Sequence, residues 1–115
     1  MRTRLSFLFT AAAIAPLWSP PALAVPHVYT GFMLGIKSME DCLNQAEKIG
    51  RNNGFTENIE IVGSGSMKDF HAGHNNDPIS LSVSCSTKLG GAAIAVAGMN
   101  NDDTFAMFNR IYEAF

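Results

Sequence analysis

The chain has 115 residues, of which 47% are hydrophobic and 16% charged, with eight basic and ten acidic side chains. This length predicts one domain, and the sequence has no Lys/Arg cluster of the kind that nucleic acids or anionic lipids attract. The two cysteines, Cys42 and Cys85, lie too far apart in the sequence for the C-x-x-C arrangement of a catalytic dithiol.

The first 24 residues have the layout of a secretory signal peptide. Two arginines precede an apolar run over residues 5–18, which is shorter than the roughly 20 residues that a membrane-spanning helix needs. Small residues then predict cleavage between Ala24 and Val25. We expect export to the periplasm or the medium, leaving residues 25–115 as a single domain with no stable membrane anchor. This domain has six basic and ten acidic residues, a net charge of −4, so we expect no nucleic-acid partner.

The first half of this domain predicts a strand followed by a helix. Residues 28–36 alternate between two sets of side chains, as a strand does. Ser38 is a typical helix N-cap, and Gly54 favours a left-handed helix end. Between them, apolar residues recur at helical spacing. The expected apolar stripe consists of Met39, Cys42, Leu43, Ala46 and Ile49.

A second strand is predicted over residues 57–62. The next segment, residues 63–78, is rich in Gly, Ser, Asn and Asp and predicts a long loop, either mobile or functional. Within it, residues 67–70 either extend the strand or form a short turn.

The remaining chain predicts two strands and a terminal helix. Residues 79–87 alternate apolar side chains with serines and form the clearest strand, with Cys85 on its apolar face. A glycine turn leads to a fourth strand over residues 92–99. The helix that follows has an apolar stripe of Phe105, Phe108, Ile111, Tyr112 and Phe115.

The resulting order, β-α-β-β-β-α, indicates an α+β fold with two layers. We expect a mainly antiparallel four-stranded sheet with both helices on one face. Cys42 lies on the apolar stripe of the first helix and Cys85 on the apolar face of the third strand, so both thiols belong to the helix–sheet interface. We therefore predict a structural disulfide, typical of oxidising compartments, that contributes roughly 4 kcal/mol in the chain-entropy model.

Several features together resemble the small exported bacterial α+β proteins of unknown function. They are the signal peptide, the helix-borne Cys42, the strand-borne Cys85, the sequence Gly-Gly-Ala-Ala-Ile-Ala-Val-Ala-Gly at residues 90–98 and the aromatic terminal helix. The resemblance covers most of residues 28–115. It implies a compact α+β fold and brings no activity with it.

A metal-binding protein is the alternative function. His71 and His74, with Asp69 and Asp77 beside them, fall in or next to the predicted loop, and imidazole with carboxylate ligands suits a divalent transition metal such as Zn, Cu or Ni. The H-x-x-H spacing is a weak signal, because polar loops also collect histidines by chance. A small hydrolase is the third possibility, with a histidine as base, but no nucleophile is identified and no catalytic residue is assigned.

Small residues on two strands point to a binding surface instead. If the strands over residues 28–36 and 92–99 adjoin, the sheet face away from the helices forms a shallow apolar trough edged by serines. Alternatively, these residues let the helices approach closely. We predict a non-enzymatic binding or protein-interaction module, whose partner is an unknown protein or a second copy of the chain. The residues concerned are Ala93, Ala95 and Ala97, and Gly31 and Gly35 beside Tyr29 and Met33.

Overall fold

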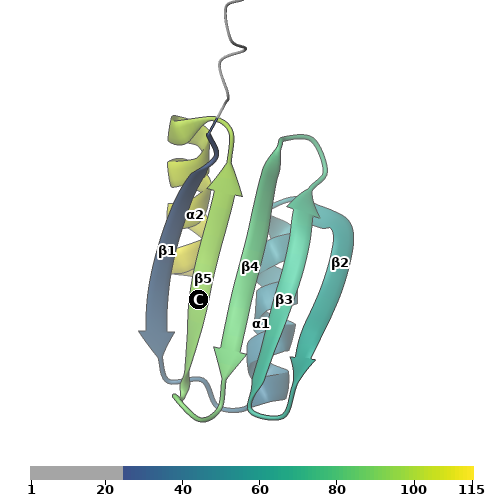
Figure 1. The fold of residues 1–115 in the computed structure, drawn as a ribbon, viewed down its shortest axis with the longest axis vertical. Coiled ribbons are helices and arrows are strands. Elements are labelled where there is room, and N and C mark those ends of the chain that lie inside the picture. Colours follow the sequence, from purple (N-terminus) through teal and green to yellow (C-terminus); the bar gives the residue numbers. More distant parts are fainter. Residues whose placement is uncertain (1–24) are drawn as a thin grey trace, which may run out of the picture.

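The computed structural model describes residues 25–115 as one small α+β domain (Figure 1). The predicted signal peptide lies outside the described residues. A five-stranded sheet has the strand order β1-β5-β4-β3-β2, and each neighbouring pair is antiparallel. Both helices lie behind the sheet in Figure 1, α2 behind β1 and β5 and α1 behind β3 and β4. The elements are β1 (His27–Leu34), α1 (Met39–Asn52), β2 (Phe55–Ser64), β3 (Met67–His74), β4 (Ile79–Ser86), β5 (Gly91–Gly98) and α2 (Asn101–Ala114).

The prediction of a four-stranded sheet is wrong, because the segment expected to be a long loop contains a fifth strand, β3. The inward side chains of β3 include only two apolar ones, the buried Phe70 and Ala72, and this short alternation was hidden among charged and small residues. A two-residue turn connects β2 to β3, with Gly65 at φ +65°. Hairpin turns need positive φ at this position, so the glycines that predicted a loop form a hairpin.

The ends of both helices follow their local sequence. Ser38 caps α1, because its side chain accepts a hydrogen bond of 3.0 Å from the backbone N–H of Asp41. Gly54, at φ +85°, ends the same helix as predicted. Asn100 caps α2 in the same way, accepting from the backbone N–H of Asp103 at 3.0 Å. No helix in residues 25–115 is long and apolar enough to cross a membrane.

The core lies between the helices and the inward face of the sheet. The predicted alternation of β4 is confirmed, because its apolar residues are buried and meet the apolar stripe of α1. The inward side chains of β5 complete this layer on the side of α2. The largest fully buried side chains include Phe55, Phe70, Leu81, Ile94 and Ile111.

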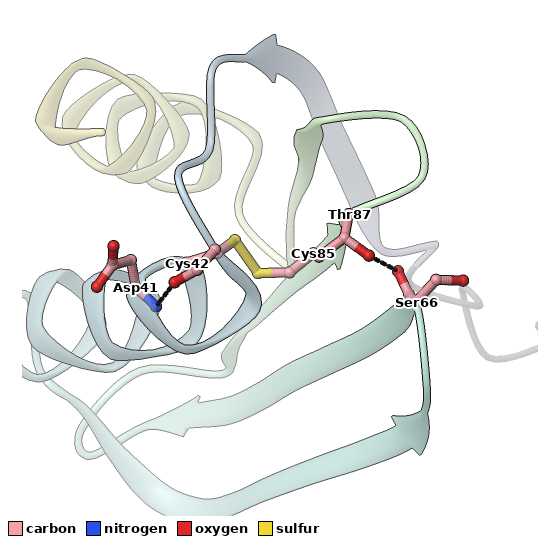
Figure 2. Close-up of a disulfide and its surroundings, with 6 residues drawn as sticks. Asp41, Cys42, Ser66, Cys85 and Thr87 are labelled. Carbon is pink, nitrogen blue, oxygen red and sulfur yellow. Dashed lines mark hydrogen bonds between the residues drawn. A yellow bond between two sulfur atoms is a disulfide. The ribbon is translucent and has the colours of Figure 1, made fainter.

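A disulfide joins Cys42 of α1 to Cys85 of β4, as predicted (Figure 2). Its Cα atoms are 6.1 Å apart, and the two cysteines are 1% and 0% exposed. Beyond Cys85, the backbone N–H of Thr87 donates to the Ser66 carbonyl at 3.0 Å, which ties the end of β4 to the β2–β3 turn. The bridge therefore fastens α1 to a strand that is itself held on both sides.

Replacing both cysteines with alanine should lower the free energy of unfolding by about 4 kcal/mol, because the bridge closes a loop with a sequence separation of 43. Urea unfolding of the oxidised protein and of the Cys42→Ala/Cys85→Ala variant measures this difference. A loss below about 1 kcal/mol would show that the unfolded chain is not constrained as the loop model requires.

An aromatic row packs α2 against β1. The ring of Tyr29 lies 5.1 Å from that of Phe105 and 6.2 Å from that of Phe108, and Phe108 stacks on Tyr112 at 5.5 Å. Gly31 lies beneath this row, and a Cβ there would come within 2.6 Å of Tyr112 Cε2. The small residue at this position therefore allows the helix to approach, which was one of the two predicted alternatives.

We expect Gly31→Ala to destabilise the domain by about 1–3 kcal/mol, because the added methyl group displaces the Tyr112 ring. Gly73→Ala is the matched control, since the nearest atom to its Cβ is 3.7 Å away. Thermal and urea unfolding of both variants give the comparison. Equal stability of the two variants would contradict the proposed close contact.

Candidate interaction surface

The sheet face opposite the helices, here called the open face, is uncovered in residues 25–115 (Figure 1). The strand registers align its side chains in four rows that cross all five strands. In order from β1 to β2, the rows are Val28-Ala97-Ser80-Gly73-Glu57, Thr30-Ala95-Ser82-His71-Glu60, Phe32-Ala93-Ser84-Asp69-Val62 and Leu34-Gly91-Ser86-Met67-Ser64.

The centre of the open face is low because its two central strands carry small side chains. Alanine and glycine of β5 lie beside the serines of β4. A depression of about 350 Å³ lies there, and the side chains of Ala95, Ala97, Ser80, Ser82 and His71 line it. The predicted trough is therefore found only in part: β5 contributes to it as expected, but the serines of β4 form its floor and β1 does not line it.

An apolar wall borders this floor on the β1 side. Its members Val28, Phe32 and Leu34 are 57%, 46% and 74% exposed. The prediction had placed Gly31 and its neighbours Tyr29 and Met33 on this face, and that assignment is wrong, because those side chains point to the helices. Val28, Phe32 and Leu34 of the same strand instead face outward.

An acidic wall borders the floor on the other side. Glu57, Glu60 and Asp69 come from β2 and β3, and His71 stands among them. The His71 Nε2 atom is 4.0 Å from Asp69 Oδ2. The other oxygen of this carboxylate, Oδ1, is buried and accepts no hydrogen bond from residues 25–115. Because Oδ1 is buried, a donor arriving at the open face would reach this carboxylate through its other oxygen, Oδ2.

The two histidines of the predicted metal site do not converge. His71 belongs to the open face, whereas His74 pairs with Phe55 on the helix side. The His74 Nδ1 atom accepts the backbone N–H groups of Asn76 and Asp77 at 3.2 and 3.1 Å, and its ring meets the edge of Phe55 at 5.3 Å.

The other nitrogen of His74, Nε2, lies against the backbone of Gly54, where an added Cβ would be only 2.5 Å away. Asp77 Oδ2 is 3.8 Å from Nδ1. Within residues 25–115, no three His, Cys, Asp or Glu side chains come together as a metal would require. The donor set of Asp69, His71, His74 and Asp77 therefore divides into two separate histidine–aspartate pairs, and neither supplies enough ligands for the predicted site.

Residues 25–115 contain no hydrogen-bonded serine–histidine pair of the kind that a hydrolase would need. The register sets His71 opposite Ser82 and Glu60, but no hydrogen bond joins a serine hydroxyl to a histidine in the described chain.

A second cavity, of about 450 Å³, lies at the C-terminal end of β1, with Lys37, Asp41, Gln45 and Phe115 in its lining. These side chains are a cation, a carboxylate, an amide and an aromatic ring, which together suggest no particular ligand.

Comparison of the chain with protein-family models, with curated proteins and with solved structures gave no match. The geometry of the open face is therefore the basis for a functional proposal.

The two histidines should differ in their effect on stability. We expect His74→Ala to lower the free energy of unfolding by about 1–2 kcal/mol, because it removes two hydrogen bonds and the contact with Phe55. His71→Ala should change it by less than about 0.5 kcal/mol, since that side chain lies on the open face. Urea unfolding tests both. A larger loss for His71→Ala would contradict these separate placements.

Proposed function

We propose that the protein is an exported, non-enzymatic binding module whose open face binds a segment of another protein. The buried Cys42–Cys85 bridge supports work in an oxidising compartment, the periplasm or the medium, because such bonds persist there. Binding is favoured over catalysis because the open face has a depression between an apolar wall and an acidic wall. The titratable groups of this face form no nucleophile–base pair.

One observation carries this proposal: a floor of alanine and serine lies between an apolar wall and an acidic wall. Large apolar side chains exposed side by side typically mark an interaction site. Small residues on the floor leave room for the backbone of an extended segment. A suitable partner presents apolar side chains to Val28, Phe32 and Leu34, and lysine or arginine to the opposite wall.

Electrostatics favour the same partner. Glu57 and Glu60 are exposed on the acidic wall, and the half-buried carboxylate of Asp69 lies beside His71 on the same wall. A cationic side chain would supply donors to these carboxylates, with the short geometry of charge-assisted hydrogen bonds. The net charge of −4 for residues 25–115 adds a long-range attraction for a basic partner.

Peptide selection tests this proposal. Peptides selected from a random display library against the folded protein should combine apolar residues with lysine or arginine. Ala95→Arg should weaken their binding at least about tenfold in calorimetry, because it fills the floor and repels the cationic side. Amide chemical shifts should change on β4 and β5.

Asn52→Arg is the matched control, because it adds the same charge to an exposed position on the helix layer. It should leave peptide affinity unchanged. Equal binding by the Ala95→Arg protein, or selection of peptides without positive charge, would argue against the proposal.

A further inference from the structure

Within residues 25–115, the outer edge of β1 pairs with no other strand. The backbone N–H of Gly35 donates to the carbonyl of Gly90, the residue before β5, at 2.8 Å. Antiparallel pairing alternates, so the N–H and C=O groups of the even-numbered residues of β1 point away from β5. Tyr112 confirms this direction, because its hydroxyl donates to the outward carbonyl of Phe32 at 3.3 Å. The strand contains no proline, no charged Lys, Arg, Asp or Glu, and no register shift.

The opposite edge of the sheet is built differently. β2 has two register shifts against β3, and Asn58, within the second, adopts φ +50°. Glu57 and Glu60 also add charge to this edge. Bulges and charges of this kind prevent further strand addition. Of the two edges, only β1 retains the flat, uncharged form on which another strand can pair.

We propose that two copies of the chain associate through antiparallel pairing of their β1 edges. The proposal goes beyond the peptide-binding role of the open face, because it uses the strand edge. With Gly31 on the two-fold axis, every outward backbone group of one β1 faces a complementary group of the other. The Phe32 carbonyl can accept the new bond as well as that of Tyr112, because a carbonyl oxygen has two lone pairs.

The side chains in this register suit a second copy. Val28 of each chain lies opposite Leu34 of the other, and Thr30 lies opposite Phe32. Cross-strand pairs of apolar and β-branched side chains stabilise a sheet, and here they bring into contact residues that are 57%, 74% and 46% exposed in the single chain. The strand has no formal charge apart from the titratable His27, so self-pairing brings no lysine, arginine or carboxylate against its like.

The helix layer also fits the two-fold arrangement. Strands in a sheet lie roughly 4.8 Å apart, and α2 packs across both β1 and β5. If α2 lies over the gap between β1 and β5, its helix axis is about half a strand spacing inside β1. The two-fold axis lies about half a strand spacing outside β1, so the two α2 helices are roughly 10 Å apart. That is an ordinary distance for packed helices. The aromatic row of α2, including the half-exposed Phe105, then meets its counterpart. Because β2 resists pairing, association closes at two copies.

A charge exchange tests both the interface and its register. Wild-type protein should dimerise in sedimentation experiments across a dilution series. Val28→Lys/Leu34→Lys should raise the dissociation constant at least about tenfold, because each new charge faces a like charge in the other copy. Val28→Lys/Leu34→Glu should restore the dimer, since each new cation then faces an anion. Both substituted side chains are exposed, so the fold should survive, and circular dichroism provides the check.

A wild type that remains monomeric at the highest concentration would overturn the proposal, and so would a Val28→Lys/Leu34→Lys protein that dimerises like wild type. Dissociation of both double variants would overturn the register centred on Gly31. Ala95→Arg should leave the dimer intact, because Ala95 lies on the floor of the open face and away from the edge. Loss of peptide binding and loss of dimerisation are therefore separate outcomes.

Discussion

The two helices cover only one face of the sheet, and this limits where the chain can bury apolar side chains. Five strands at a spacing of roughly 4.8 Å span about 20 Å, and two packed helices, each about 10 Å wide, cover that width once. The chain between residues 25 and 115 has two helices and both lie on one side. Apolar burial is therefore concentrated on the inward side chains of β4 and β5. Their outward neighbours are alanine and serine, which tolerate contact with water and leave a low surface.

The two halves of the helix layer are secured by different means. A covalent bridge attaches α1 to β4, whereas α2 depends on burial of its apolar stripe and on the aromatic row along β1. The acidic wall of the open face lies over the bridged half, and the apolar wall lies over the other. The acidic wall therefore belongs to the half with a covalent cross-link, and the apolar wall to the half that packing holds without such a link.

The sequence predicted those parts of the fold in which periodicity and local chemistry agree. The stripe of α1, the alternation of β4 and the caps at Ser38 and Gly54 placed the cysteines correctly. β3 was missed because tertiary pairing between two neighbours stabilises a strand whose own composition favours a loop. The outward face of β1 was misassigned for a related reason. An edge strand is apolar on both sides here, so alternation alone does not tell which side faces the helices. The separation of His71 from His74 follows directly once β3 is a strand, since an odd spacing puts two residues on opposite faces.

The pairing of β1 with β5 has a consequence for how the chain folds. Gly31 pairs with Ile94, and the first strand of the described chain has the last strand as its one neighbour. The β2–β3–β4 meander and the Cys42–Cys85 bridge can form from consecutive elements, but β1 gains its partner only when β5 is available. Contacts this distant along the chain form slowly, because their loop must close first. Until β5 is available, the apolar side chains of β1 therefore lack the strand beside which they pack.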